Sequence, residues 1–84
     1  MSWSEITESE VAVNQIRSHY QTLDRYRRTS EALHGRRIES VYLYAASLRE
    51  QVKALTDAMH DDVQVARWGR KFEEYLQQYQ LVNE

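Results

Sequence analysis

The chain contains no proline and only two glycines, Gly35 and Gly69, among its 84 residues. A fold rich in β-strands needs a tight turn every few residues, and such turns depend on glycine and proline. Long helices with few connections avoid that requirement. The same scarcity excludes phosphate-binding loops of the P-loop or dinucleotide type, which need several closely spaced glycines. The sequence therefore predicts an all-α fold.

The middle of the chain carries the clearest helical pattern. Apolar residues recur there at alternating spacings of three and four: Ile38, Val41, Ala45, Leu48, Val52, Leu55 and Met59. At about 100° per residue these positions share one face of a helix, about 100° wide. Tyr42 and Tyr44 flank this face and widen it. We predict a helix over about residues 36–59, whose wide face either packs on two helices of the same chain or partly contacts another chain.

The last third of the chain repeats the pattern with more aromatic residues. Its apolar face consists of Val65, Trp68, Phe72, Tyr75, Leu76, Tyr79 and Val82. Asp61 followed by Gln64 matches a capping box, which predicts a helix over about residues 62–82. Gly69 lies at the edge of the apolar face, where it costs about 1 kcal/mol relative to alanine. We therefore expect a neighbouring helix to approach closely at Gly69.

The first segment begins with its own helix signals. Thr7 and Glu10 match a capping box, and Ile6 precedes it as the residue of a hydrophobic staple; a start at Ser2 is the alternative. The inward face then runs through Ala12, Val13, Ile16, Tyr20 and Leu23. The next core position on the helical wheel is Arg27. The apolar pattern stops there, because arginine is rarely buried unpaired.

The segment that joins the first two apolar faces is rich in arginine. Residues 24–37 hold five arginines and two acids, a local charge of 5 − 2 = +3, so the other 70 residues carry −2 − 3 = −5. Two chain reversals fit this segment, and both remain open.

In one reversal the first helix spans about residues 7–28, and Thr29 or Ser30 caps the second helix. In the other it spans about 7–33, and Gly35 supplies the left-handed residue after its end. A third arrangement fuses the first two helices into one rod.

Three apolar faces on three helices predict one helical domain, residues 1–84, folded as an antiparallel three-helix bundle. The alternative is a long helical hairpin completed by dimerisation. The absence of cysteine excludes disulfides, zinc fingers, iron–sulfur sites and a thiol nucleophile. The sequence contains neither an apolar stretch of membrane-spanning length nor a signal peptide at its start, so we expect a cytoplasmic protein that does not bind membranes.

No residue pattern indicates a catalytic, cofactor or metal site. The serines lack a Gly-x-Ser-x-Gly setting, and the histidines do not form His-x-x-x-His. Glu31 and His34 have the spacing found in di-iron carboxylate bundles, but those sites need a second such pair and two further glutamates. Flanking arginines also oppose a cation. We therefore predict a protein that is not an enzyme and holds neither metal nor cofactor.

The arginine-rich segment is the best candidate for binding, because guanidinium groups suit carboxylates and phosphates and a tyrosine ring can stack on a base. We predict a small protein–protein interaction module (an adaptor, inhibitor or assembly factor) that binds a larger, acidic partner and forms a homo-oligomer. It would use a helix-face patch and this arginine-rich tip. The predicted partner-binding residues are Arg25, Tyr26, Arg27, Arg28, Arg36, Arg37, Tyr42 and Tyr44.

Other interpretations of the same features stay open. One is a small nucleic-acid-associated regulator that uses the same arginines, although the isoelectric point near 5.9 argues against it. Another is that the arginines pair within the molecule or only increase its solubility. Leu43 lies on the opposite side of the second helix, where together with Ala46 and Ala54 it forms a candidate secondary contact.

Overall fold

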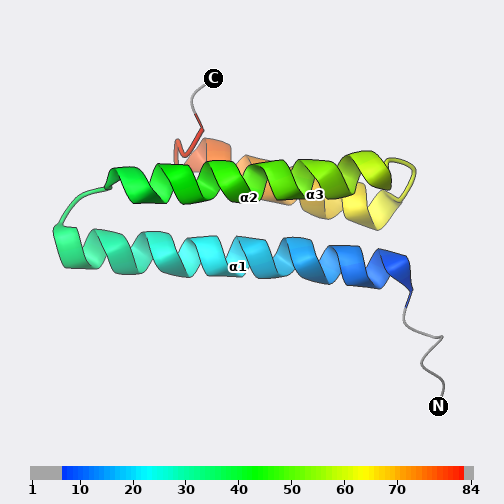
Figure 1. Cartoon of the computed structure of the whole chain (residues 1–84), viewed down its shortest axis with the longest axis horizontal. Coiled ribbons are helices and arrows are strands. Elements are labelled where there is room, and N and C mark those ends of the chain that lie inside the picture. The colour runs from blue at the N-terminus through cyan, green and yellow to red at the C-terminus, as the bar shows by residue number, and fades with distance from the viewer. Residues whose placement is uncertain (1–6, 83–84) are drawn as a thin grey trace, which may run out of the picture.

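A computed structural model of the chain describes residues 7–82 and contains three helices. They are α1 (Glu8–His34), α2 (Glu39–Ala58) and α3 (Val63–Gln78). Each helix contacts the other two, and residues 7–82 contain no strand. The predicted all-α three-helix bundle is therefore confirmed. Figure 1 shows α1 and α2 side by side, with α3 behind α2 and ending near the connection between α1 and α2.

The start of α1 agrees with the predicted capping box. The backbone N–H of Glu10 donates to the Thr7 hydroxyl at 3.1 Å, and the Thr7 N–H donates to the Glu10 carboxylate at 3.1 Å. Two of the orphan donors at the helix start are thus satisfied. Ser2 and Ile6, which belong to the alternative start and to the staple, lie outside the described residues.

The reversal after α1 takes place at Gly35. This residue has φ 68, in the left-handed region, and its N–H donates to the carbonyl of Glu31 at 2.8 Å. Glycine adopts this conformation without the steric cost that a Cβ imposes. The longer of the two predicted first helices is therefore the observed one, whereas an end near Arg28 and a rod fusing α1 with α2 are both wrong.

The starts of α2 and α3 differ from their predicted positions. Helix α2 begins at Glu39 rather than near residue 36, because Ile38 is extended and serves as its N-cap. The N-cap of α3 is Asp62, not Asp61: its carboxylate accepts from the N–H groups of Gln64 and Val65, both at 3.0 Å. Two adjacent aspartates have the same capping chemistry, and the tight α2–α3 turn selects the second of them.

The end of α3 comes four residues before the predicted one. Gln80 has φ 53, its N–H donates to the Gln77 carbonyl, and the N–H of Leu81 donates to the Leu76 carbonyl at 2.8 Å. These two bonds around a left-handed residue form a Schellman motif, which usually uses glycine. The motif folds the chain back, so Leu81 is buried although it follows the helix.

The core consists of one stripe from each helix, extended by Leu81. Its buried hydrophobic members are Ala12, Ile16, Leu23, Val41, Ala45, Leu48, Val52, Val65, Phe72, Tyr75, Leu76 and Leu81. The predicted inward positions Val13, Tyr20 and Trp68 are partly buried and pack against this core. The apolar patterns therefore identify the inward faces correctly.

Gly69 marks the close approach that the sequence predicts. A Cβ built on Gly69 would clash with the Cγ2 methyl of Thr56 on α2. The absence of a side chain therefore sets the distance between α2 and α3 at this level.

We predict that Gly69→Ala destabilises the protein by about 1 kcal/mol, because the clash outweighs the helix propensity that alanine adds. The effect of Gly69→Ala on stability should change sign in a Thr56→Ser background. Serine lacks the clashing methyl and keeps the hydroxyl bond to the Lys53 carbonyl at 3.0 Å. There Gly69→Ala should stabilise by up to about 1 kcal/mol. Urea unfolding of the four proteins measures the cycle, and equal effects of Gly69→Ala in both backgrounds would contradict the contact.

Candidate functional site

The predicted arginine-rich tip lies where α1 ends and α2 begins, at the same end of the bundle as the C-terminus of α3 (Figure 1). We call this end the basic tip; it comprises Arg25, Tyr26, Arg27, Arg28, Arg36 and Arg37. The structure separates its arginines into two groups. Arg27 and Arg37 are bound within the fold, whereas Arg25, Arg28 and Arg36 are exposed.

Arg27 is buried, with only 7% of its surface exposed. Its Nε donates to the Tyr75 hydroxyl at 2.9 Å, and its two terminal nitrogens donate to Asp24 and Glu31, both at 3.2 Å. The guanidinium also stacks over the Tyr79 ring, 4.0 Å from its centroid. Arg27 therefore continues the core stripe of α1 past the point where the apolar pattern stops, and it is not available to a partner.

The groups around Arg27 hold one another in definite protonation states. Burial alone would lower the pKa of Arg27, but the bonds to Tyr75 and Asp24 and the charge of Glu31 outweigh it and raise this pKa. Burial, together with the bond that the Tyr75 hydroxyl donates to Asp24 at 3.0 Å, raises the pKa of Tyr75 to about 12. Near neutral pH the site thus contains a cation and a protonated phenol.

Arg37 connects the loop to the ends of two helices. Its Nε donates to the Glu31 carboxylate at 3.0 Å, and its Nη1 donates to the backbone carbonyl of Tyr79, the C-cap residue of α3. A cation at the C-terminus of a helix complements the dipole and an orphan carbonyl. Arg37 therefore stabilises the end of α3, and its side chain is only 24% exposed.

Arg25, Arg28 and Arg36 form the solvent-facing part of the basic tip. The Arg28 side chain is 69% exposed and pairs with Asp24 at 3.2 Å. Within residues 7–82, no carboxylate lies within 4.0 Å of Arg25 or Arg36. These two arginines therefore carry the charge of the tip that is free to meet a partner.

The predicted tyrosines lie in different seams of the bundle. The Tyr26 hydroxyl donates to Ser40 at 2.8 Å, and the Tyr26 ring meets Tyr44 edge-on with centroids 5.2 Å apart, so both flank the α1–α2 seam. Tyr42 lies on the other edge of α2, its ring centroid 5.9 Å from the Arg37 guanidinium. Tyr42 and Tyr44 therefore do not form one patch, and their rings widen two separate contacts of α2.

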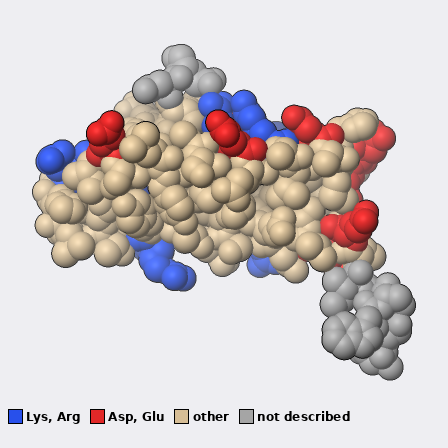
Figure 2. All heavy atoms as spheres, viewed as in Figure 1, with Lys and Arg blue, Asp and Glu red and all other residues tan. Residues whose placement is uncertain are grey.

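The structure also shows a surface of which the sequence pattern indicates only a part, through Leu43 and Ala54. Exposed residues on the outer side of the α1–α2 seam form a stripe on each helix, and we call the two stripes together the neutral face. The stripes are Val11, Gln15, Ser18, Thr22, Tyr26, Thr29 and Leu33 on α1, and Ser40, Leu43, Ser47, Gln51, Ala54 and Ala58 on α2. None of these residues is charged, although 29% of the chain is. Arg25, three residues after Thr22 and four before Thr29, stands at the outer margin of the α1 stripe. Figure 2 shows this side of the molecule, whose centre holds almost no charged atoms.

The neutral face is continuous across the seam. A groove between the helices is lined by residues of both, among them Ser18, His19, Gln51 and Ala54. Burial lowers the pKa of His19 from its usual 6.5, so this histidine is neutral at pH 7. Comparing the uncharged positions of two predicted helices would have identified each stripe, but only the packing places them side by side.

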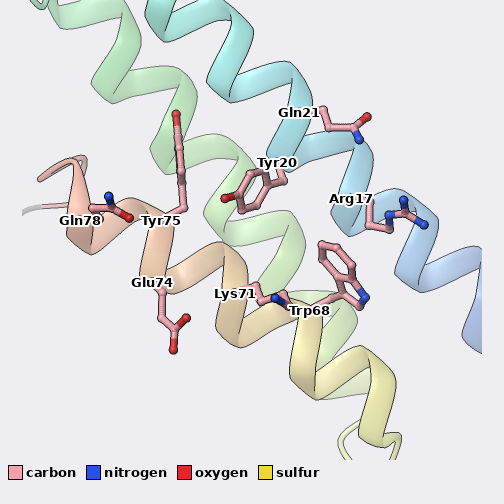
Figure 3. A pocket seen from close by; sticks show the side chains of 8 residues that line it. All are labelled: Arg17, Tyr20, Gln21, Trp68, Lys71, Glu74, Tyr75 and Gln78. Atoms are coloured by element: carbon pink, nitrogen blue, oxygen red, sulfur yellow. The ribbon is translucent and has the colours of Figure 1, made fainter.

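A third feature is a groove of about 360 Å³ between α1 and α3. Figure 3 shows the Trp68 indole in this groove with Arg17 and Lys71 beside it. Their charged groups lie 5.2 and 5.5 Å from the ring centroid, within the range of cation–π attraction. Glu74 is the only carboxylate among the described residues that line the groove. Its cations and aromatic rings cover the α1–α3 seam.

Comparison with protein-family models, with curated proteins and with solved structures gives no significant match. Among residues 7–82, no helix combines the length and apolarity needed to cross a membrane. The same residues contain no group of three or more potential ligand side chains placed to hold a metal ion. Glu31, the carboxylate of the Glu31–His34 pair, accepts hydrogen bonds from Arg27 and Arg37.

We predict that Arg27→Ala lowers the free energy of unfolding by about 3 kcal/mol, because it leaves Asp24 and Tyr75 without their shared cation in a largely buried site. Arg25→Ala, on the exposed side of the same helix, is the control and should change it by less than about 0.5 kcal/mol. Urea denaturation followed by circular dichroism measures both. Equal effects of the two substitutions would contradict a structural role for Arg27.

We also predict that the protein loses stability on acidification below about pH 4.5. The hydrogen bond from Arg37 lowers the pKa of Glu31 below 4.5, and the bond from the Val65 N–H lowers the pKa of Asp62. A carboxylate with a lowered pKa in the folded state stabilises it above the unfolded pKa, and this contribution disappears as the pH falls through the folded pKa.

Chemical denaturation between pH 7 and pH 2.5 tests this dependence. Glu31→Gln should be less stable than the wild type at pH 7 and should lose less stability on acidification. Glu74→Gln alters an exposed glutamate of α3 and should leave the wild-type pH profile unchanged. A wild-type stability that stays constant down to pH 3 would contradict the assignment.

Proposed function

We propose that this chain is a small, non-enzymatic interaction module that binds a larger protein through its basic tip. The observation that carries the proposal is the composition of the exposed surface at that end. Arg25 and Arg36 lie there without a carboxylate partner among residues 7–82, near Leu33, which is 77% exposed, and Tyr26, which is 38% exposed. Arginine and tyrosine beside exposed apolar area are enriched in protein–protein interfaces.

The charge of this surface favours an acidic partner. Arg27 and Arg37 are satisfied inside the molecule, so they do not compete for a ligand, and the free guanidinium groups project from a rigid helix end and a short loop. Such groups accelerate encounter with an acidic surface and fix the orientation of docking, while the apolar contacts slow dissociation. The proposed roles are those of an adaptor, inhibitor or assembly factor that supplies a surface and performs no chemistry.

A nucleic-acid partner is the second candidate, because guanidinium groups also bind phosphates. Two features of the tip favour the protein partner. Only three of its five arginines are exposed, and the Tyr26 ring is held by Tyr44 and Ser40 rather than left free to stack on a base. A binding site for nucleic acid usually presents a denser array of cations.

We predict that the double substitution Arg25→Glu and Arg36→Glu abolishes partner binding. The matched control is Arg67→Glu with Arg70→Glu, which places the same change of charge on two exposed arginines of α3. The tagged variants would be used for quantitative affinity purification from the native host, with helicity checked by circular dichroism. Proteins retained by the wild type and by the control should fall at least about tenfold with the tip variant.

Equal retention by the tip variant and the wild type would refute binding through the tip. Retention that disappears after nuclease treatment would instead favour the nucleic-acid candidate. In that case the affinity of the purified chain for nucleic acid must fall steeply with salt, because bound phosphates release counterions.

A further inference from the structure

The neutral face has the composition of a contact surface rather than of a solvated one. Four of the six large hydrophobic residues that are exposed among residues 7–82 belong to it: Val11, Tyr26, Leu33 and Leu43. Its remaining members are Ser, Thr, Ala and Gln, which cost little to bury when their hydrogen bonds are met. The depletion of charge agrees with the composition of interface cores.

The neutral face is large enough for a stable pair of proteins. Helix α2 has 20 residues and is therefore about 30 Å long, and α1 is longer. Two helices side by side, each about 10 Å wide, give about 600 Å² in projection. The accessible area exceeds the projection because side chains project from the surface, so it approaches the roughly 800 Å² that each partner buries in a standard interface.

The charges at the two long edges of this face differ in their prevailing sign, although Lys53 lies between Glu50 and Asp57 on the α2 edge. Glu39, Glu50 and Asp57 are separated by 11 and 7 residues, which places them along one edge of α2. Arg17 and Arg28, also separated by 11 residues, lie on the side of α1 that faces away from α2, as does Glu10 in the first turn. Both have contacts within the chain, Arg17 with the Trp68 ring and Arg28 with Asp24, which a pairing with a second copy would have to share or replace. Figure 2 shows several acidic side chains on the upper, α2 side of the view with a basic patch among them, and basic side chains at the lower, α1 side.

Opposite edges of this kind are complementary to each other in a second copy of the same chain. A two-fold axis that lies in the contact and runs parallel to the helices places the acidic α2 edge of each copy on the basic α1 edge of the other. A two-fold axis perpendicular to the helices would place like charges together, which costs free energy.

The positions of the charges along the helices also match. Residues opposite each other across the α1–α2 seam have numbers that sum to about 70, as Tyr26 with Tyr44 and His19 with Gln51 show. The parallel axis preserves position along the helices. Glu50 of one copy therefore lies at the same height along the helix axis as residue 20 of the other copy. Arg17 is three residues from residue 20, which is a rise of about 4.5 Å along the helix.

The same arithmetic applies to the second pair of charges. Glu39 of one copy lies level with residue 31 of the other, again three residues from Arg28. Both separations are within the reach of an arginine side chain.

We propose that the neutral face is the contact between two copies of this chain, related by a two-fold axis parallel to α1 and α2. Leu43 and Leu33 supply apolar area, and Glu50–Arg17 and Glu39–Arg28 pairs between the copies fix the orientation. Both basic tips then lie at the same end, so a dimer presents Arg36 twice to an extended acidic partner, with Arg25 at the margin of the contact. The dimer is measured on the purified chain without that partner, so the two proposals are tested separately. Leu33 and Tyr26 belong to both surfaces, and in the dimer a partner of the tip meets its arginines rather than these two side chains.

The first test is the mass of the purified full chain by light scattering and sedimentation over a range of concentrations. We expect about twice 10.1 kDa for the wild type. Leu43→Glu places a charge in the contact at a residue that is 63% exposed in one copy, and should give a folded monomer. Val63→Glu changes an apolar residue that is 76% exposed but lies outside the neutral face, and should remain a dimer.

The second test is exchange of a charge pair. Arg17→Glu and Glu50→Arg should each weaken dimerisation about tenfold, since each reversal affects two pairs in the symmetric dimer. The double variant should return to within about threefold of the wild type.

A monomer at all concentrations, or a dimer unaffected by Leu43→Glu, overturns the proposal. A dimer that Leu43→Glu disrupts but that the double charge exchange does not restore overturns the proposed axis.

Discussion

One buried arginine, Arg27, connects α1 to α3 at the basic-tip end of the bundle. Arg27 occupies a core position of α1, and its guanidinium bonds to the hydroxyl of Tyr75 and to two carboxylates of its own helix. An unpaired cation there would be strongly destabilising, so the site is stable only while α3 supplies Tyr75 at the right level. This single interaction therefore couples the register of α1 to that of α3, across 48 residues of sequence.

The requirements of Arg27 also explain why tyrosine rather than phenylalanine or leucine dominates the end of α3. Tyr75 places an aromatic ring in the core and a hydroxyl on the guanidinium, and Tyr79 covers the other side of the cation with its ring. A purely apolar residue would supply area but leave the cation unsatisfied. The C-terminal carbonyl of α3 then binds Arg37, so the loop and the helix end are joined by the same group of side chains.

The sequence predicts the features that depend on local chemistry. Helical spacing identifies the inward faces, Thr7 identifies the start of α1, and Gly69 identifies a close approach, whereas Gly35 marks only one of the two reversals that the sequence leaves open. It fails where several solutions are locally equivalent: Asp61 and Asp62 can both cap a helix, and Gln80 ends α3 in a conformation usually reserved for glycine.

The candidate site is less predictable than the fold, because its residues acquire their roles from distant partners. A helical wheel predicts that Arg27 points inward, but it cannot predict that the Tyr75 hydroxyl on α3 accepts a hydrogen bond from it. It places Tyr42 and Tyr44 on the flanks of α2 without showing that they serve different seams. Each of the two helices carries one uncharged stripe of the neutral face. The stripes form one surface only because α1 packs beside α2, where the Tyr26 ring contacts the Tyr44 ring.

The shape of the molecule links these observations. The Cα positions extend over 48 × 30 × 16 Å, so the bundle is a thin slab in which α3 covers the α1–α2 pair from behind. A domain of this size buries only a little over 60% of the surface of its unfolded chain, and its margin of stability is small. Serine, threonine and glutamine on the uncovered side are readily hydrated in a single copy, yet they do not impose the desolvation cost that lysine or glutamate would impose on association. In the proposed dimer, a face of this composition permits reversible pairing, and the charges proposed to set the orientation of the two copies stand at the edges, where solvent still reaches them.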